Sequence, residues 1–464
     1  MRSSEAYRRL RGEGGTAIGL PPPALAWVAS LLAEDEGRPI LALVPHEAEA
    51  LAWLEMDEVL HGGSRAVYFP VPALTPYQEQ GASLSVRAQE VLAVERIGRD
   101  EVEAVVTSPR ALFLRLPLLT ELLRRIVRIE SGDEIPPERL TSRLVDAGYR
   151  RVDLVNQTGD FSVRGGVVDL YPPGSDRPFR LDYFGDTVES IRGFDTMSQR
   201  SDEQVEGVEI PPLALFPAGQ EAMESVADAV EARLPGQLGP EARERLRTLR
   251  QGIPFEGWES LLPLSREKTT DLPSLMEEVR VVGLEPETLV EEARRWSRRL
   301  EEDYHARRES LGIAIPPEEL LVPMDRVLEW LDRTEIRVGG TASPEGIADF
   351  GGRSTEVLHG QLPRLPREVE GARDRGERFL LVANPDHREG LEELLRAREV
   401  PLGPAGAELV DGDLTRGFRL PGAGLTLFSE AQILPRRRRP SRRRRPRDGP
   451  GVSRLRDLKV GAYV

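Results

Sequence analysis

The first candidate for chemistry in this sequence is a phosphate-binding loop. A nucleotide-hydrolysing loop ends in Gly-Lys-Ser or Gly-Lys-Thr, its backbone N–H groups cradle the phosphates, and its lysine reaches the β- and γ-phosphates. The segment that could hold such a loop reads Ala17-Ile18-Gly19-Leu20-Pro21-Pro22-Pro23-Ala24. Three successive prolines remove three N–H donors, and the sequence contains no Gly-Lys-Ser/Thr. We therefore expect no ATP hydrolysis, no catalytic residues and no bound cofactor in this polypeptide.

Other kinds of catalytic or metal site find little support. The histidines lie far apart in the sequence, at His46, His61, His305, His359 and His387, and none has metal-ligand spacing such as His-Glu-x-x-His. The absence of cysteine excludes disulfides, thiolate zinc sites and cysteine nucleophiles. No Gly-x-Ser-x-Gly motif of a serine hydrolase is present. The sequence thus predicts no metal site.

A basic tract near the C-terminus contrasts with an acidic chain. The formal net charge is −15, yet residues 436–447 read RRRRPSRRRRPR. Such a block of like charge is typical of a solvated linker, and it could also contact DNA phosphates in a salt-sensitive way without sequence preference. Both interpretations stay open. The arginines that could make weak nucleic-acid contacts are Arg436, Arg437, Arg438, Arg439, Arg442, Arg443, Arg444 and Arg445.

The N-terminal part of the chain has the pattern of an α/β fold. Residues 39–44 form a continuous apolar run followed by Pro45, as expected of a buried parallel strand. Residues 66–69 and 104–107 have the same character, and residues 84–97 between them have helical spacing. This order predicts a parallel sheet with helical crossovers.

Two further units follow. Residues 149–194 consist of short apolar runs separated by turn signals, which predicts a small β-rich insert. A separate α/β unit at 335–434 has candidate strands at 379–383 and 425–428. No apolar run is long enough for a membrane span, and the N-terminus has no secretory signal pattern. We therefore expect a cytoplasmic protein that does not contact a membrane.

The segment Tyr149 to Ser201 carries a specific resemblance. It reads YRRVDLVNQTGDFSVRGGVVDLYPPGSDRPFRLDYFGDTVESIRGFDTMSQRS. This pattern resembles domain 2 of the excision-repair protein UvrB, and it resembles the equivalent domain of bacterial transcription-repair coupling factors more closely. The run Ser198-Gln199-Arg200-Ser201 is typical of the coupling factors. Residues 74–77, 108–112 and 458–464 also resemble segments of that family.

The resemblance implies a domain plan. The body would be a UvrB-like parallel sheet of degenerate phosphate-loop type, without a Walker A motif, and the β-rich domain would be inserted into it. The chain would stop at the start of an RNA-polymerase-interacting domain. The implied boundaries are domain 1a at 1–120, domain 2 at 121–204, domain 1b at 205–334, domain 3 at 335–434, an Arg/Pro-rich linker at 435–455 and the truncated next domain at 456–464.

The resemblance also implies a function. In the family, domain 2 binds UvrA through two arginines and a phenylalanine, which fall on Arg164, Arg180 and Phe184 of this sequence. The full-length parent would be an ATP-dependent double-stranded DNA translocase that displaces stalled RNA polymerase. Its ATP, magnesium and most DNA contacts would belong to motor domains beyond this chain. Two alternatives are a UvrB-type helicase subunit and a general nucleic-acid-binding scaffold that acts through the arginine tract.

Elementary strand geometry makes these three residues reasonable binding groups. Arg164 is expected to open a strand and Arg180 to lie within another, and both are expected to protrude from the sheet as solvent-facing charges that can pair with acidic groups. Because alternate strand residues face opposite sides, Tyr183 and Phe184 should point in opposite directions. An exposed Phe184 would be a hot-spot anchor, whereas the alternative is a core phenylalanine.

Overall fold

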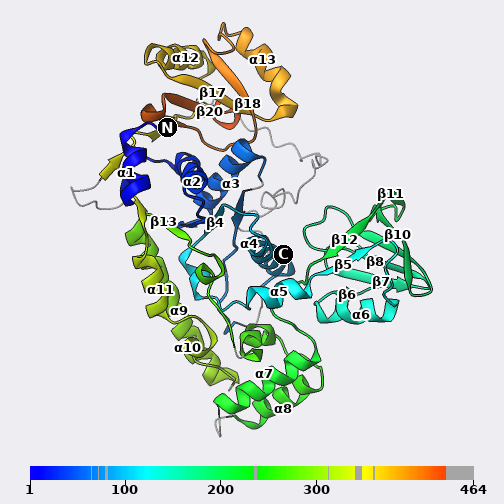
Figure 1. The fold of residues 1–464 in the computed structure, drawn as a ribbon. Coiled ribbons are helices and arrows are strands. Elements are labelled where there is room, and N and C mark those ends of the chain that lie inside the picture. Colours follow the sequence, from blue (N-terminus) through cyan, green and yellow to red (C-terminus); the bar gives the residue numbers. More distant parts are fainter. Residues whose placement is uncertain are drawn as a thin grey trace.

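The chain folds around a seven-stranded parallel sheet (Figure 1). The computed structural model describes residues 1–63, 65–71, 73–78, 82–234, 238–266, 268–311, 313–339, 347–358 and 361–434. The strand order is β15-β1-β14-β13-β2-β4-β3, and each neighbouring pair is parallel. The strands are β1 (Gly15–Ile18), β2 (Ile40–Leu43), β3 (Ala66–Tyr68), β4 (Ala104–Thr107), β13 (Arg280–Leu284), β14 (Ile336–Val338) and β15 (Ile347–Asp349).

The predicted α/β class is confirmed by this sheet. Every residue of β2 and β4 is buried, as the continuous apolar runs predicted. Helices cover both faces of the sheet, so alternate strand residues enter two separate cores: Leu41 and Val105 lie in one, Ile40 and Val106 in the other. The first core receives α4 (Leu84–Gly98), α9 (Pro286–Leu311) and α11 (Met324–Asp332), whereas the second receives α1 (Glu5–Glu13), α2 (Pro22–Glu36) and α3 (Glu47–His61).

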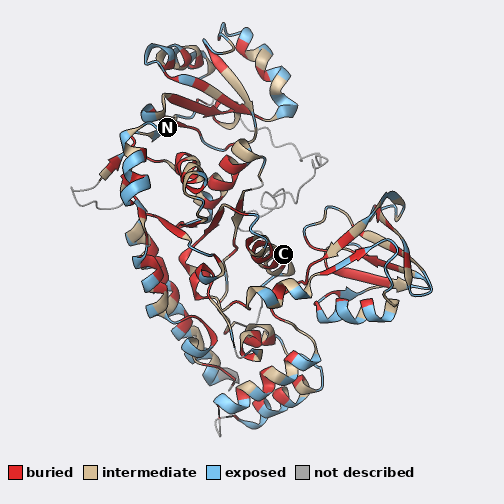
Figure 2. Cartoon of the chain, in the orientation of Figure 1, coloured by how far each residue is buried: buried red, intermediate tan, exposed pale blue. Residues whose placement is uncertain are grey.

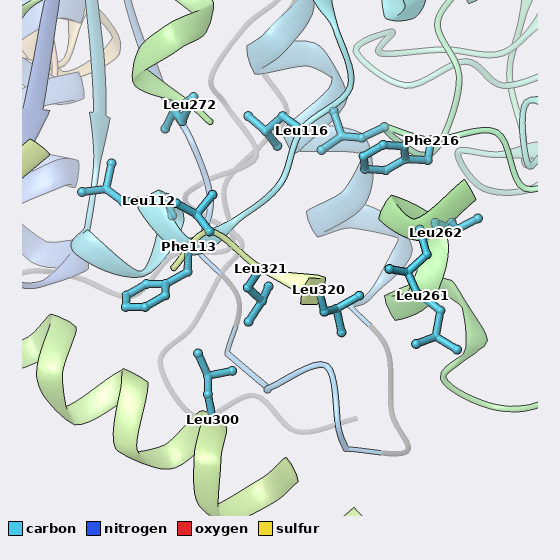
Figure 3. Packing of buried hydrophobic residues seen from close by; sticks show 14 of the residues in the cluster. Leu112, Phe113, Leu116, Phe216, Leu261, Leu262, Leu272, Leu300, Leu320 and Leu321 are labelled. Atoms are coloured by element: carbon cyan, nitrogen blue, oxygen red, sulfur yellow. The ribbon is translucent and has the colours of Figure 1, made fainter. Parts of the chain in front are cut away.

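A helical lobe extends the first core away from the sheet. Figure 3 shows Leu261 and Leu262 of this lobe near Leu320 and Leu321, with Phe113 and Leu300 on neighbouring elements. Burial of these apolar side chains fixes the lobe to the body without a sheet of its own. The lobe and its surroundings comprise η1 (Pro109–Phe113), α5 (Leu119–Arg125), α7 (Gln220–Arg233), α8 (Pro240–Arg250), η2 (Trp258–Ser265), η3 (Pro273–Leu275) and α10 (Pro317–Leu320).

A β-rich domain, called here the β domain (residues 127–210), projects from the body at the right of Figure 1. Its main sheet has the order β11-β10-β9-β8-β7-β6, and a second, two-stranded sheet joins β12 to β5. The predicted boundary at residue 204 falls before β12. The elements are β5 (Val127–Glu130), α6 (Pro137–Asp146), β6 (Arg150–Arg151), β7 (Asp160–Arg164), β8 (Val167–Leu170), β9 (Phe179–Phe184), β10 (Thr187–Phe194), β11 (Ser201–Val205) and β12 (Gly207–Ile210).

A C-terminal unit packs on the second core. Its sheet has the order β16-β19-β20-β17-β18, and it contacts the body through Trp27 and Phe418, whose ring centroids are 6.4 Å apart. The sequence predicted this unit from residue 335, yet β14 and β15 join the sheet of the body. The elements are β16 (Arg353–Ser354), η4 (Leu362–Arg364), α12 (Leu365–Asp374), β17 (Arg378–Ala383), η5 (Pro385–His387), α13 (Arg388–Arg396), β18 (Ala407–Asp411), β19 (Phe418–Leu420), η6 (Pro421–Ala423), β20 (Leu425–Ser429) and α14 (Glu430–Ile433).

Candidate partner-binding face of the β domain

A two-glycine hairpin positions the first candidate residue. Arg164 ends β7 and pairs with Val167, the first residue of β8, so Gly165 and Gly166 form the whole turn. Gly165 has a φ of +60°, a conformation that favours glycine. A Cβ on Gly166 would lie 3.1 Å from the carbonyl oxygen of Tyr183, so the turn also needs a small residue beside β9. The prediction that Arg164 opens a strand is therefore wrong: it closes one.

Strand alternation separates the β domain sheet into a core face and an outer face. Phe161, Val168 and Leu181 are buried in the core of the domain. The residues that alternate with these core residues along each strand lie on the opposite side of the pleat. We call this side the outer face; it carries Ser162, Arg164, Asp169, Arg180, Asp182 and Phe184.

Asp169 brings the two candidate arginines together. Its carboxylate accepts hydrogen bonds from Arg180 Nε at 2.7 Å and Arg180 Nη2 at 2.9 Å, and a third from Arg164 Nη2 at 2.6 Å. The Asp169 side chain is 1% exposed, that of Arg164 is 51% exposed and that of Arg180 is 18% exposed. Asp169 is not among the residues that the sequence pattern predicted for the site. The Gly-Gly hairpin register, which places Asp169 diagonally across from Arg164 on the same face, could have revealed it.

Arg180 is held on several sides. In addition to Asp169, its Nη1 donates to the carbonyl oxygen of Gln199 at 3.4 Å and to Ser201 Oγ at 3.3 Å, and its guanidinium lies 4.8 Å from the ring centre of Phe194. The hydrogen bonds to Asp169 raise the pKa of Arg180 above its usual value. The expectation that Arg180 is a solvent-facing charge is therefore wrong, because it is mostly buried and supports the sheet. For Arg164 the expectation is confirmed.

Phe184 is an exposed aromatic at the end of β9. Its side chain is 79% exposed, whereas Tyr183 packs against the core of the β domain. The prediction that the two aromatics face opposite sides is confirmed, and a core role for Phe184 is excluded. Gly185, with a φ of +61°, follows in the turn to β10. A large apolar side chain held at a strand end is well placed to insert into a partner.

Helix α4 connects the β domain to the body. Leu84 and Ala88 of α4 pack in the core of the β domain, whereas Val91 and Val94 pack in the core of the body. Figure 2 shows buried residues along α4 where it lies between the two units. The sequence predicted this helix but not its double contact. The orientation of the outer face relative to the body therefore depends on α4.

A buried carboxyl lies at this joint. Glu95 of α4 is paired with Arg99 at 2.9 Å, and Arg99 reaches Glu209 of β12 at 2.9 Å. Burial raises the pKa of Glu95 to about 7. The folded state therefore holds this proton more tightly than the unfolded state, whose glutamate titrates near pH 4.5. Between these two values the folded state binds more protons, so stability falls as the pH rises.

Replacing Glu95 by glutamine should remove this pH dependence. We expect the free energy of unfolding of the wild type to fall, relative to Glu95→Gln, by roughly 1–3 kcal/mol between pH 4.5 and 7.5. Urea unfolding at several pH values measures the difference. Glu189→Gln changes an exposed acid of β10 and should track the wild type. Parallel pH profiles for wild type and Glu95→Gln would show that the joint is not a titrating element.

The turn at Gly19, within the segment considered above as a possible phosphate loop, packs against another stretch of backbone. Gly19 has a φ of +69°, and a Cβ there would lie 2.8 Å from the amide nitrogen of Gly351 and 2.9 Å from that of Gly352. The amide of Gly352 donates to the carbonyl of Gly19 at 3.0 Å. Helix α2 begins at Pro22 without a side-chain cap. The backbone after β15 therefore packs directly against the turn at Gly19.

In the described ranges, no group of three or more His, Asp or Glu side chains is arranged to hold a metal ion. Within the same part of the chain, no helix is long and apolar enough to cross a bilayer. The arginines at 436–439 and 442–445, the linker and residues 456–464 lie outside the described residues.

Comparison with known proteins relates this geometry to a family. Residues 127–216 match the family described as "UvrB interaction domain", a range that contains both sheets of the β domain. The chain is 26% identical to the transcription-repair-coupling factor of Bacillus subtilis over 96% of its own length. It is 29% identical to the protein of that name from Myxococcus xanthus over 86% of its length, and 28% identical to that of Escherichia coli over 47%.

The chain spans a minor part of these relatives. It covers 40% of the Bacillus subtilis protein and 37% of the Myxococcus xanthus protein. The match to the UvrB interaction domain contains Arg164, Asp169, Arg180 and Phe184, so the outer face belongs to the matched region. Over most of its length, the chain matches the N-terminal part of transcription-repair-coupling factors, with a UvrB interaction domain at residues 127–216.

Proposed function

We propose that this chain acts in transcription-coupled DNA repair as a non-catalytic adaptor that docks UvrA on the outer face of the β domain. The observation that carries the proposal is that Phe184 and Arg164 are both exposed on the outer face, in a region that matches the UvrB interaction domain. Aromatic and arginine side chains are enriched among the hot-spot residues of protein interfaces.

Each residue has a separate task in this proposal. Phe184 inserts into an apolar pocket of the partner and loses its exposed surface there. Arg164 uses one N–H for Asp169, and its other donors can pair with a carboxylate of the partner. Arg180 and Asp169 support the face from inside the sheet.

The remaining steps of the repair process are assigned to a longer parent protein. We propose that the parent is an ATP-dependent double-stranded DNA translocase, that ATP and magnesium bind in its motor domains, and that RNA polymerase and DNA are contacted mainly there. The body of the present chain is a UvrB-like sheet of phosphate-loop type that has lost its nucleotide site. Support comes from the parallel sheet and from the backbone packed against Gly19.

Calorimetric titration of UvrA with the 464-residue chain tests the docking proposal. The double variant Arg164→Ala/Phe184→Ala should bind UvrA about 100-fold or more weakly, because each residue of a hot spot contributes roughly 1.5–3 kcal/mol. The matched control is Arg151→Ala/Ile253→Ala. Arg151 is exposed on the edge strand β6, and Ile253 is 58% exposed outside the β domain. The control should bind UvrA like the wild type.

A further inference from the structure

We infer that Asp169 is a positioning residue of the docking face, which holds the guanidinium of Arg164 in the orientation that the partner meets. The inference rests on the proposed function and assigns different roles to the two arginines. Arg164 is the contact residue, whereas Arg180 completes the support under Asp169. No contact between Asp169 and the partner is involved, because its carboxylate is 1% exposed.

The geometry assigns these different roles. Arg180 donates hydrogen bonds from Nε and Nη2 to Asp169, and from Nη1 to Gln199 and Ser201. Few of its donors remain for a partner, and its side chain is 18% exposed. Arg164 donates one hydrogen bond from Nη2 to the same carboxylate, and its side chain is 51% exposed. It therefore combines a fixed guanidinium with donors that face solvent.

Holding Arg164 in place favours binding. A free arginine side chain loses rotamer entropy when a partner orders it, and this loss weakens binding. A charge-assisted bond from a buried carboxylate orders the side chain before the partner arrives, so less entropy is lost in the complex. Asp169 can do this because the two-bond contact with Arg180 fixes its own carboxylate plane.

The variant Asp169→Asn tests the inference with little change in shape. An asparagine has one acceptor oxygen in place of two and no charge, so it cannot accept from Arg180 Nε, Arg180 Nη2 and Arg164 Nη2 together and holds Arg164 less firmly. We expect UvrA affinity to fall about tenfold, which is the loss typical of one charge-assisted hydrogen bond. The matched control is Asp160→Asn, because Asp160 is a buried acid of β7 that pairs with Arg150 instead.

A double-mutant cycle separates positioning from loss of structure. In the Arg164→Ala background, Asp169→Asn should cause little further loss of affinity, because the residue that it orients is absent. An equal loss in both backgrounds, or an unchanged affinity of folded Asp169→Asn, would overturn the inference. If Asp169→Asn does not fold, Arg164→Lys serves as the second variant. It keeps the charge at an exposed position but lacks the planar fork, and we expect several-fold weaker binding; unchanged affinity would overturn the inference.

One readout does not need the partner. In nitrogen-15 spectra of the unbound chain, guanidinium signals of Arg164 should show restricted rotation in the wild type and free rotation in Asp169→Asn. Free rotation in both proteins would overturn the inference. If Arg164→Ala and Phe184→Ala leave UvrA binding intact while the spectra change as expected, the docking proposal fails and the Asp169 support remains. The two failures are thereby distinguishable.

Discussion

Arg180→Ala is expected to lower the free energy of unfolding of the β domain by about 3 kcal/mol, because removing one partner of a buried ion pair leaves an uncompensated charge. The charge is that of Asp169, which would keep a single bond from Arg164. The bonds to Gln199 and Ser201 and the contact with the ring of Phe194 would be lost as well. Urea unfolding followed by near-ultraviolet circular dichroism measures this change.

Arg164→Ala is the control for this experiment. Its side chain is half exposed, and Arg180 still provides two bonds to Asp169 after the change, so the stability loss should stay below about 1 kcal/mol. Both variants should bind UvrA more weakly, Arg180→Ala through disorder of the face and Arg164→Ala through loss of a contact. Equal stability losses in the two variants would contradict the division of roles described above.

We also expect that this chain does not turn over ATP, even in the presence of DNA. The turn at Gly19 is packed against the amides of Gly351 and Gly352, and prolines at 21–23 provide no N–H donors for phosphates. The sequence also lacks a Gly-Lys-Ser/Thr motif. Two assays measure this: phosphate release in the presence of double-stranded DNA, and binding of a fluorescent ATP analogue. Both should give only background signals. A DNA-stimulated ATPase activity that survives further purification would contradict this prediction.

Local patterns predicted the elements of the fold better than their partners. The apolar runs at 40–43 and 104–107 and the helix at 84–98 are visible because burial on both sides demands continuous apolar residues and helices show a 3.6-residue period. The assignment of β14 and β15 to the body could not be predicted. Their pairing with β1 joins residues 321 positions apart for β14 and 331 apart for β15, and three-residue strands carry no signal for a partner.

The candidate site was predicted in part. Phe184 and Arg164 lie on the surface as expected, since alternation and the hairpin turn fix their direction. The burial of Arg180 could not be predicted, because it depends on the loop that ends β10 and brings Gln199 back over the sheet. The position of α4 between two cores could not be predicted from the sequence either. An apolar helix face has the same pattern whichever unit it packs against.

The titration of UvrA with the full chain tests the central claim most directly. Wild-type chain, the double variant Arg164→Ala/Phe184→Ala and the control Arg151→Ala/Ile253→Ala are compared at one salt concentration without nucleotide. The account predicts saturable binding by the wild type and the control, and a loss of about 100-fold or more for the double variant. Equal binding by all three proteins, or no binding by a folded wild-type chain, would contradict docking on the outer face.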